Sequence, residues 1–160
     1  MSDAGAPVLI GYDGSDPARH AVQSAGELFG HRPAFVVTAW EPGMEYHFIG
    51  TGTAGVGAAA PEVDLGATRR VDAARRARAE RIAEDGAELA RSAGLRAEPL
   101  AIAEEGNAAK TIVELARERR ASAIVVGSRG LGAIRARLEG STSKAVLKHA
   151  PCPVLVVHDD

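Results

Sequence analysis

The sequence predicts an α/β fold in which an open parallel sheet carries helices on both faces. Short apolar runs alternate with longer segments of helical periodicity along the chain. The segments between the apolar runs are long enough for crossover helices, which parallel strands need. The run Ala123–Gly127 is apolar throughout, as is typical of a central parallel strand buried on both faces. These three observations together indicate a chain of βαβ units.

Composition narrows the class of protein further. The chain has 160 residues, 46% hydrophobic and 25% charged, which fits one globular domain over 1–160. A net charge of −2 and 4% aromatic residues argue against a nucleic-acid-binding role. A single cysteine, Cys152, excludes an intramolecular disulfide framework and a cysteine-rich zinc site. The sequence shows neither a signal-peptide pattern nor a membrane-spanning run, so we expect a cytoplasmic protein without membrane contact.

The first βαβ unit begins with an apolar strand that ends at a polar turn. The strand covers Pro7–Tyr12, and Ser15 or Asp16 in the turn can cap the next helix. Small and apolar residues then recur at helical spacing until Gly30, where the helix is expected to end. The following apolar run, Ala34–Trp40, is the second predicted strand.

A segment rich in glycine and alanine separates this unit from a long helix. Residues 43–66 show no sustained period and predict a flexible loop. The helix follows over 67–93, with Gly94 just past its end. Its arginines alternate with carboxylates, which favours a solvated face with local ion pairs over a nucleic-acid or membrane surface.

The second half of the chain repeats the alternation of strands and helices. Asn107 can cap the first of its two helices, and a loop containing glycine leads into the second. We assign strands to Arg96–Ala101, Ala123–Gly127 and Pro153–Val157, and helices to 108–120 and 141–150. Ligands of open parallel sheets bind beyond the carboxyl ends of the strands, which directs attention to Asp13 and Gly127.

The loop before the last helix carries the features of a phosphate site. Gly127 ends a strand and Gly140 precedes a helix, and at such positions a backbone turns sharply or lets a ligand approach closely. The helix opens with three hydroxyl residues, Ser141–Ser143, and a free helix N-terminus attracts anions. Arg129 adds positive charge. Taken one at a time, however, the glycines also fit ordinary turns, and Ser141 fits a structural cap.

The spacing of this loop resembles a known signature. The pattern G-x2-G-x9-G-S, which runs from Gly127 to Ser141, resembles the nucleotide-binding signature of the universal stress protein family. The segments 11–15 and 149–157 resemble that family's first nucleotide contact and its C-terminal strand, in the same order. The resemblance covers nearly the whole chain apart from 43–66.

The resemblance implies a sheet of order 3-2-1-4-5 with ATP lying across the carboxyl ends of its strands. Asp13 would lie beside the adenosine, although it also fits a cap for the following turn. The main chain around Ala39 would meet the adenine edge, and Mg²⁺ or Mn²⁺ would be bound mainly by phosphate and water. The nucleotide-binding residues carried over are Gly11, Tyr12, Asp13, Ser15, Ala39, Gly127, Arg129, Gly130, Gly140, Ser141, Thr142 and Ser143.

The function that the resemblance implies is an ATP-binding regulatory module of a stress response, with protein partners that the sequence does not identify. A slow ATP hydrolase or phosphotransferase is the alternative, for which Asp13 and the hydroxyls of Ser141–Ser143 are the candidate groups. A scaffold that binds no nucleotide is a second alternative, and the intact glycine pattern argues against it. The apolar strand Val154–Val157 falls at a sheet edge in this order, which together with the resemblance predicts a homodimer through that strand.

Overall fold

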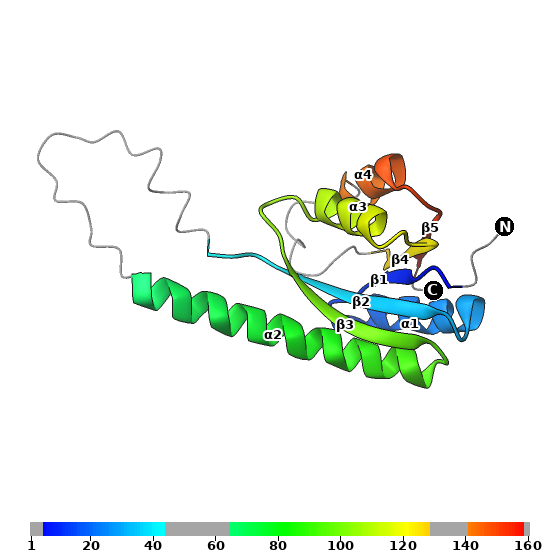
Figure 1. Ribbon diagram of the computed structural model, residues 1–160, viewed down its shortest axis with the longest axis horizontal. Helices are drawn as coiled ribbons and strands as arrows, with labels where there is room; N and C mark the ends of the chain where they lie inside the picture. The colour runs from blue at the N-terminus through cyan, green and yellow to red at the C-terminus, as the bar shows by residue number, and fades with distance from the viewer. Residues whose placement is uncertain (1–4, 44–64, 129–140, 159–160) are drawn as a thin grey trace, which may run out of the picture.

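The computed structural model describes residues 5–43, 65–128 and 141–158 (Figure 1). Strands and helices alternate along the chain as the sequence predicts. The strands are β1 (Val8–Gly11), β2 (Pro33–Trp40), β3 (Arg96–Ala103), β4 (Ala123–Gly127) and β5 (Val154–Val157). The helices are α1 (Asp16–Phe29), α2 (Leu65–Ser92), α3 (Ala108–Glu118) and α4 (Ser141–His149).

The strands form one five-stranded sheet in the order β3-β2-β1-β4-β5. Every neighbouring pair is parallel, and Val8 of β1 lies between Ala34 of β2 and Ala123 of β4. The predicted fold class and strand order are therefore confirmed. The strand order reverses between β1 and β4, so the carboxyl ends of these two strands mark the place where ligands bind in folds of this type.

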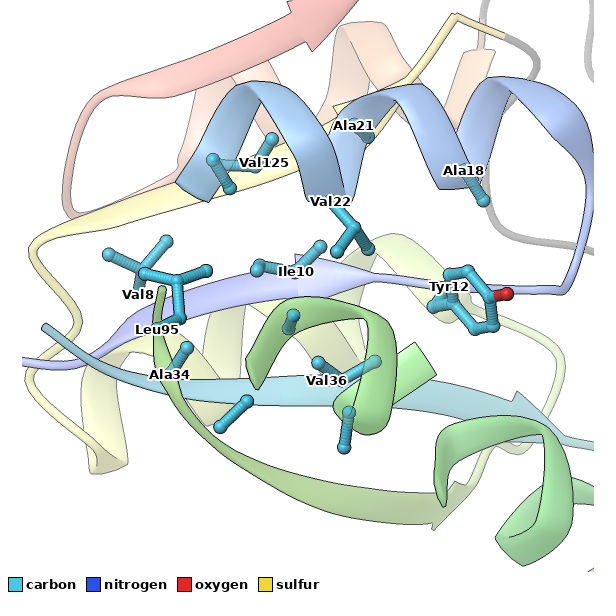
Figure 2. Packing of buried hydrophobic residues seen from close by; sticks show 14 of the residues in the cluster. Val8, Ile10, Tyr12, Ala18, Ala21, Val22, Ala34, Val36, Leu95 and Val125 are labelled. Carbon is cyan, nitrogen blue, oxygen red and sulfur yellow. The ribbon is translucent and has the colours of Figure 1, made fainter. Parts of the chain in front are cut away.

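The sheet separates two hydrophobic cores, because successive side chains of a strand point to opposite faces. Helices α1 and α2 cover one face, and α3 and α4 cover the other (Figure 1). In β1, Val8 and Ile10 pack in the α1/α2 core, whereas Leu9 packs in the α3/α4 core. Figure 2 shows Val22 of α1 over Ile10.

The helix caps largely follow the sequence signals. Ser15 caps α1 by accepting a hydrogen bond from the main-chain N–H of Ala18 at 3.3 Å. Asn107 caps α3 by accepting one from Lys110 at 3.0 Å. Gly94 follows α2 with a φ of +97°, a conformation that favours glycine.

Three predicted boundaries are wrong by two residues. Helix α2 begins at Leu65, so the last two residues of the predicted loop 43–66 are helical. The part of that loop over 44–64 lies outside the described residues. Strand β3 continues to Ala103 because it stays in register with β2. Helix α3 ends at Glu118 because Arg120 takes a φ of +50°.

Helix α2 is the longest element, and its N-terminal part extends past the ends of β2 and β3 (Figure 1). Its exposed face carries ion pairs, among them one between Arg76 and Glu80 at 2.9 Å, as the charge pattern predicts. Within the described ranges, no helix combines the length and apolar character needed to cross a bilayer.

Candidate functional site

Asp13 lies directly after β1, at the carboxyl edge of the sheet. Its Oδ1 accepts hydrogen bonds from the main-chain N–H of Ser15, at 2.9 Å, and from the Ser15 hydroxyl. Ser15 in turn caps α1, so the two side chains form one network at the strand-to-helix turn. The interpretation of Asp13 as a turn residue is thus confirmed. This role also holds its carboxylate at the edge where a ligand is expected, with lone pairs to spare.

Tyr12 contributes its ring to the core. The residue is 3% exposed, and its ring packs in the α1/α2 core with Ile10 and Val36 (Figure 2). Burial raises the pKa of the phenol above its usual range. The Tyr12 N–H donates to the carbonyl of Val37 at 2.9 Å, and its carbonyl accepts from the Thr38 hydroxyl at 2.9 Å. Tyr12 therefore anchors the end of β1 to β2, and Gly11 is the last residue of that strand.

Gly127 ends β4 beside the start of α1. A Cβ at this position would lie 2.9 Å from the carbonyl carbon and oxygen of Pro17. The first turn of α1 therefore approaches β4 as closely as a glycine allows. Sequence reasoning considered a turn or a ligand at Gly127 and missed this packing role, which depends on a contact between distant segments.

The phosphate side of the predicted site is only partly described. Helix α4 begins at Ser141, as predicted, and its N-terminus follows the carboxyl end of β4. Arg129, Gly130 and Gly140 lie outside the described residues, and the roles predicted for Thr142 and Ser143 stay predictions. Because α4 begins on the carboxyl side of the sheet, the N–H groups of its first turn belong to the same edge as Asp13.

The opposite end of this edge holds a carboxyl pair that sequence reasoning missed. Glu104 follows β3, and its main-chain N–H donates to the carbonyl of Trp40 at 2.9 Å. Glu104 is 3% exposed as a whole residue, and its side chain is hydrogen-bonded to that of Glu41. The segment after β2 is held against α2, because Arg75 donates to the Glu41 carbonyl at 3.4 Å. Burial, followed by the charge of Glu41 and their hydrogen bond, raises the pKa of Glu104 to about 7.

This pKa predicts a pH-dependent stability. The folded chain binds the Glu104 proton more tightly than the unfolded chain does, because an unfolded glutamate titrates at about pH 4.3. Its contribution to the free energy of unfolding should therefore fall as the pH rises from about 4.3 to about 7. Glu104→Gln should exceed the wild type by about 1 kcal/mol at pH 5 and by about 3 kcal/mol or more at pH 8.

Urea unfolding at both pH values measures this difference. The neighbouring Glu105 is exposed, so Glu105→Gln is the matched control and should change neither value. Equal stability of the wild type and Glu104→Gln at pH 8 would contradict the burial of an ionisable group at this position.

The described part of the chain contains no group of three His, Cys, Asp or Glu side chains placed to hold a metal ion. The carboxyl edge of the sheet contains the carboxylate of Asp13 after β1, the N-terminus of α4 after β4, and the buried carboxyl of Glu104 after β3. These groups suit binding by hydrogen bonds and main-chain N–H donors.

Comparisons with known proteins bear on the fold and on the family. The model of the Universal stress protein family matches residues 6–158. The universal stress protein in the QAH/OAS sulfhydrylase 3′ region of Thermus aquaticus is 35% identical over 153 residues, which cover 94% of this chain and 96% of the relative.

Two solved structures are similar over almost the whole chain. A universal stress protein in complex with cAMP is 26% identical, with a TM-score of 0.61 and 98% of each chain covered. The universal stress protein from Archaeoglobus fulgidus in complex with dAMP is 23% identical, with a TM-score of 0.59, and the match covers 98% of this chain and 99% of that one. At that identity the second likeness shows the fold alone.

Proposed function

Because the chain belongs to the Universal stress protein family, we propose that it binds ATP across the carboxyl edge of its sheet and acts as a nucleotide-dependent regulatory module. The observation that carries the proposal is the place of the glycine pattern in the fold. The segment from Gly127 to Ser141 joins the end of β4 to the start of α4, beside the reversal of strand order. The cAMP complex of a similar protein supports a ligand with an adenine base.

We infer a direction for the bound nucleotide from the positions of these elements. The phosphates would lie at Gly130, Gly140 and the first turn of α4, where free N–H groups and the helix dipole attract anions. Asp13 would receive hydroxyl hydrogen bonds from the ribose. The base would lie over the end of β2 at Ala39, which is half-buried. A divalent ion would be held by phosphate oxygens and water, and it would supply neutralisation of the phosphate charge.

Regulation follows if ATP binds two conformations of the chain with different affinities. The binding of a ligand changes the equilibrium between two conformations only as far as its affinities for the two conformations differ. Asp13, the candidate base at the described edge, is held in its turn by hydrogen bonds from Ser15, and we expect it beside the ribose rather than the phosphates. We therefore favour binding over hydrolysis.

Equilibrium titration with Mg·ATP by calorimetry tests the proposal. We expect saturable binding of one nucleotide per chain. A flat titration at millimolar Mg·ATP would contradict the proposal and favour a scaffold that binds no nucleotide. Multiple turnover of [γ-³²P]ATP that is lost in Asp13→Asn, while binding persists, would instead establish the ATP hydrolase.

We also propose a homodimer formed through β5. This strand ends the sheet, and the main-chain carbonyls of Pro153 and Val157 accept hydrogen bonds from the β4 side. Because main-chain groups alternate sides along a parallel strand, those of Val156 point to the outer edge. An apolar edge of this kind is normally covered, and pairing with a second copy covers it.

Sedimentation at micromolar concentration should give twice the chain mass for the wild type. Val156→Pro should give the mass of one chain, because it removes an N–H donor from the outer edge while sparing the bonds to β4. Circular dichroism checks that the variant is folded. A monomeric wild type, or a folded Val156→Pro that remains dimeric, would contradict pairing through β5.

A further inference from the structure

Glu104 holds an acceptor for which the described chain provides no donor. Its Oε2 is buried and has no hydrogen-bond partner among the described residues, and the carboxyl of Glu41 lies beside the Glu104 carboxyl. Buried polar atoms are almost always paired, and a buried acceptor left unpaired is costly. An unpaired atom at the edge where ligands are expected therefore indicates a hydrogen bond that a ligand completes.

We propose that Glu104 Oε2 accepts a hydrogen bond from the amino group of the bound purine, and so selects adenine over bases with a carbonyl at that position. This inference rests on the proposed function, because it assumes that a nucleotide occupies the edge. It adds a specificity-determining residue beyond the glycine pattern, just after β3, a strand that contains none of the site residues predicted from the sequence.

The position of Glu104 fits this role. Ala39 pairs with Ile102 and Trp40 pairs with Ala103, so the next residues, Glu41 and Glu104, lie opposite each other just beyond the strands. The bond between the Glu104 N–H and the Trp40 carbonyl continues that ladder. Glu104 is thus adjacent to the main chain after Ala39, where the base is expected.

The distance along the edge fits an extended nucleotide. Three strand spacings separate β4 from β3, which amounts to about 14 Å at about 4.8 Å each. Phosphates held at the start of α4, next to β4, therefore leave the base within reach of the ends of β2 and β3. The ribose would then lie near β1, where Asp13 is located.

The two carboxyl groups of Glu41 and Glu104 determine what kind of ligand group can bind beside them. Two neighbouring carboxyls repel a phosphate, so the end of the ligand at Glu104 must be neutral or cationic. Mg²⁺ and Ca²⁺ take six or more oxygen ligands, and Glu41 is exposed, so the pair is a poor site for either ion. A carboxyl keeps acceptor lone pairs in both its ionised and its protonated form, so Glu104 can accept a hydrogen bond whether or not it shares a proton with Glu41.

An amino group on the base satisfies this acceptor, whereas a carbonyl would place two acceptors against each other. Sites built around such a hydrogen bond reject analogues that lack the donor strongly. Hypoxanthine differs from adenine by a carbonyl at that position, so ITP is the matched probe for ATP.

Calorimetric titration of the full chain with Mg·ATP and Mg·ITP at pH 8 tests the inference. The wild type should bind ATP at least about tenfold more tightly than ITP. Glu104→Gln should bring this ratio close to one, since an amide can turn either its oxygen or its NH₂ toward the base. Glu105→Gln, a change at the exposed neighbour, should keep the wild-type ratio.

The outcomes separate this inference from the proposed function. A wild type that binds ATP and ITP equally well overturns the role of Glu104 and leaves ATP binding intact, and this result needs no variant. A Glu104→Gln variant that keeps the wild-type ratio of ATP to ITP affinity leads to the same conclusion. A wild type that binds neither nucleotide removes the proposed function itself.

Discussion

Replacing Gly130 by valine should lower the affinity of the chain for Mg·ATP by at least about 100-fold, which corresponds to about 2.7 kcal/mol. Gly130 is the second glycine of the pattern that begins at Gly127. In such loops the main chain approaches the phosphates closely, and a branched side chain occupies the space the phosphates need. Calorimetric titration measures the change, and circular dichroism checks the fold.

A matched control separates loss of the site from a general disturbance of the loop. Ala133→Val adds bulk to the same loop at a position outside the glycine pattern, and it should change ATP affinity by less than about threefold. An unchanged affinity in folded Gly130→Val would contradict the assignment of the phosphates to this loop.

Gly86→Ala should destabilise the fold by about 2 kcal/mol or more. Gly86 is buried in α2, and a Cβ there would lie 2.5 Å from Cδ1 of the Tyr12 ring and 2.8 Å from Cγ1 of Val36. In an exposed helix the same change would gain about 1 kcal/mol from helix propensity, so the sign of the effect is diagnostic. Helix α2 cannot easily move away from the sheet to make room for the added methyl group, because it packs against β2 and β3.

Urea denaturation gives the free energy of unfolding for this comparison. Glu88→Ala, at an exposed position two residues along the same helix, should stay within about 0.5 kcal/mol of the wild type. A Gly86→Ala variant as stable as the wild type would show that α2 lies farther from the sheet than the structure places it.

Local signals explain why most of the fold could be predicted from the sequence. The apolar run of β4 predicts a doubly buried strand, and Ser15 and Asn107 are caps whose chemistry acts over a few residues. The sequence did not predict element boundaries that depend on contacts with segments far away in the chain. The last two residues of β3 are added by pairing with β2, and no feature near Ala103 marks that end.

The residues of the candidate site also fall into those that local sequence signals predict and those that depend on contacts between distant segments. Asp13 and Ser15 lie together after β1, where the strand order places them. The alternation of Val8, Ile10 and Tyr12 on one face was available in the sequence, and it predicts the inward ring of Tyr12. Glu104 could not be identified from its neighbours, because its burial depends on the register that brings it opposite Glu41.

A crystal structure of the chain grown with saturating Mg·ATP would show where the nucleotide binds. We predict a triphosphate at the first turn of α4, a ribose beside Asp13, and an adenine at the end of β2 with its amino group on Glu104. An ATP molecule bound elsewhere, or protein atoms filling that edge at saturating nucleotide, would contradict the account.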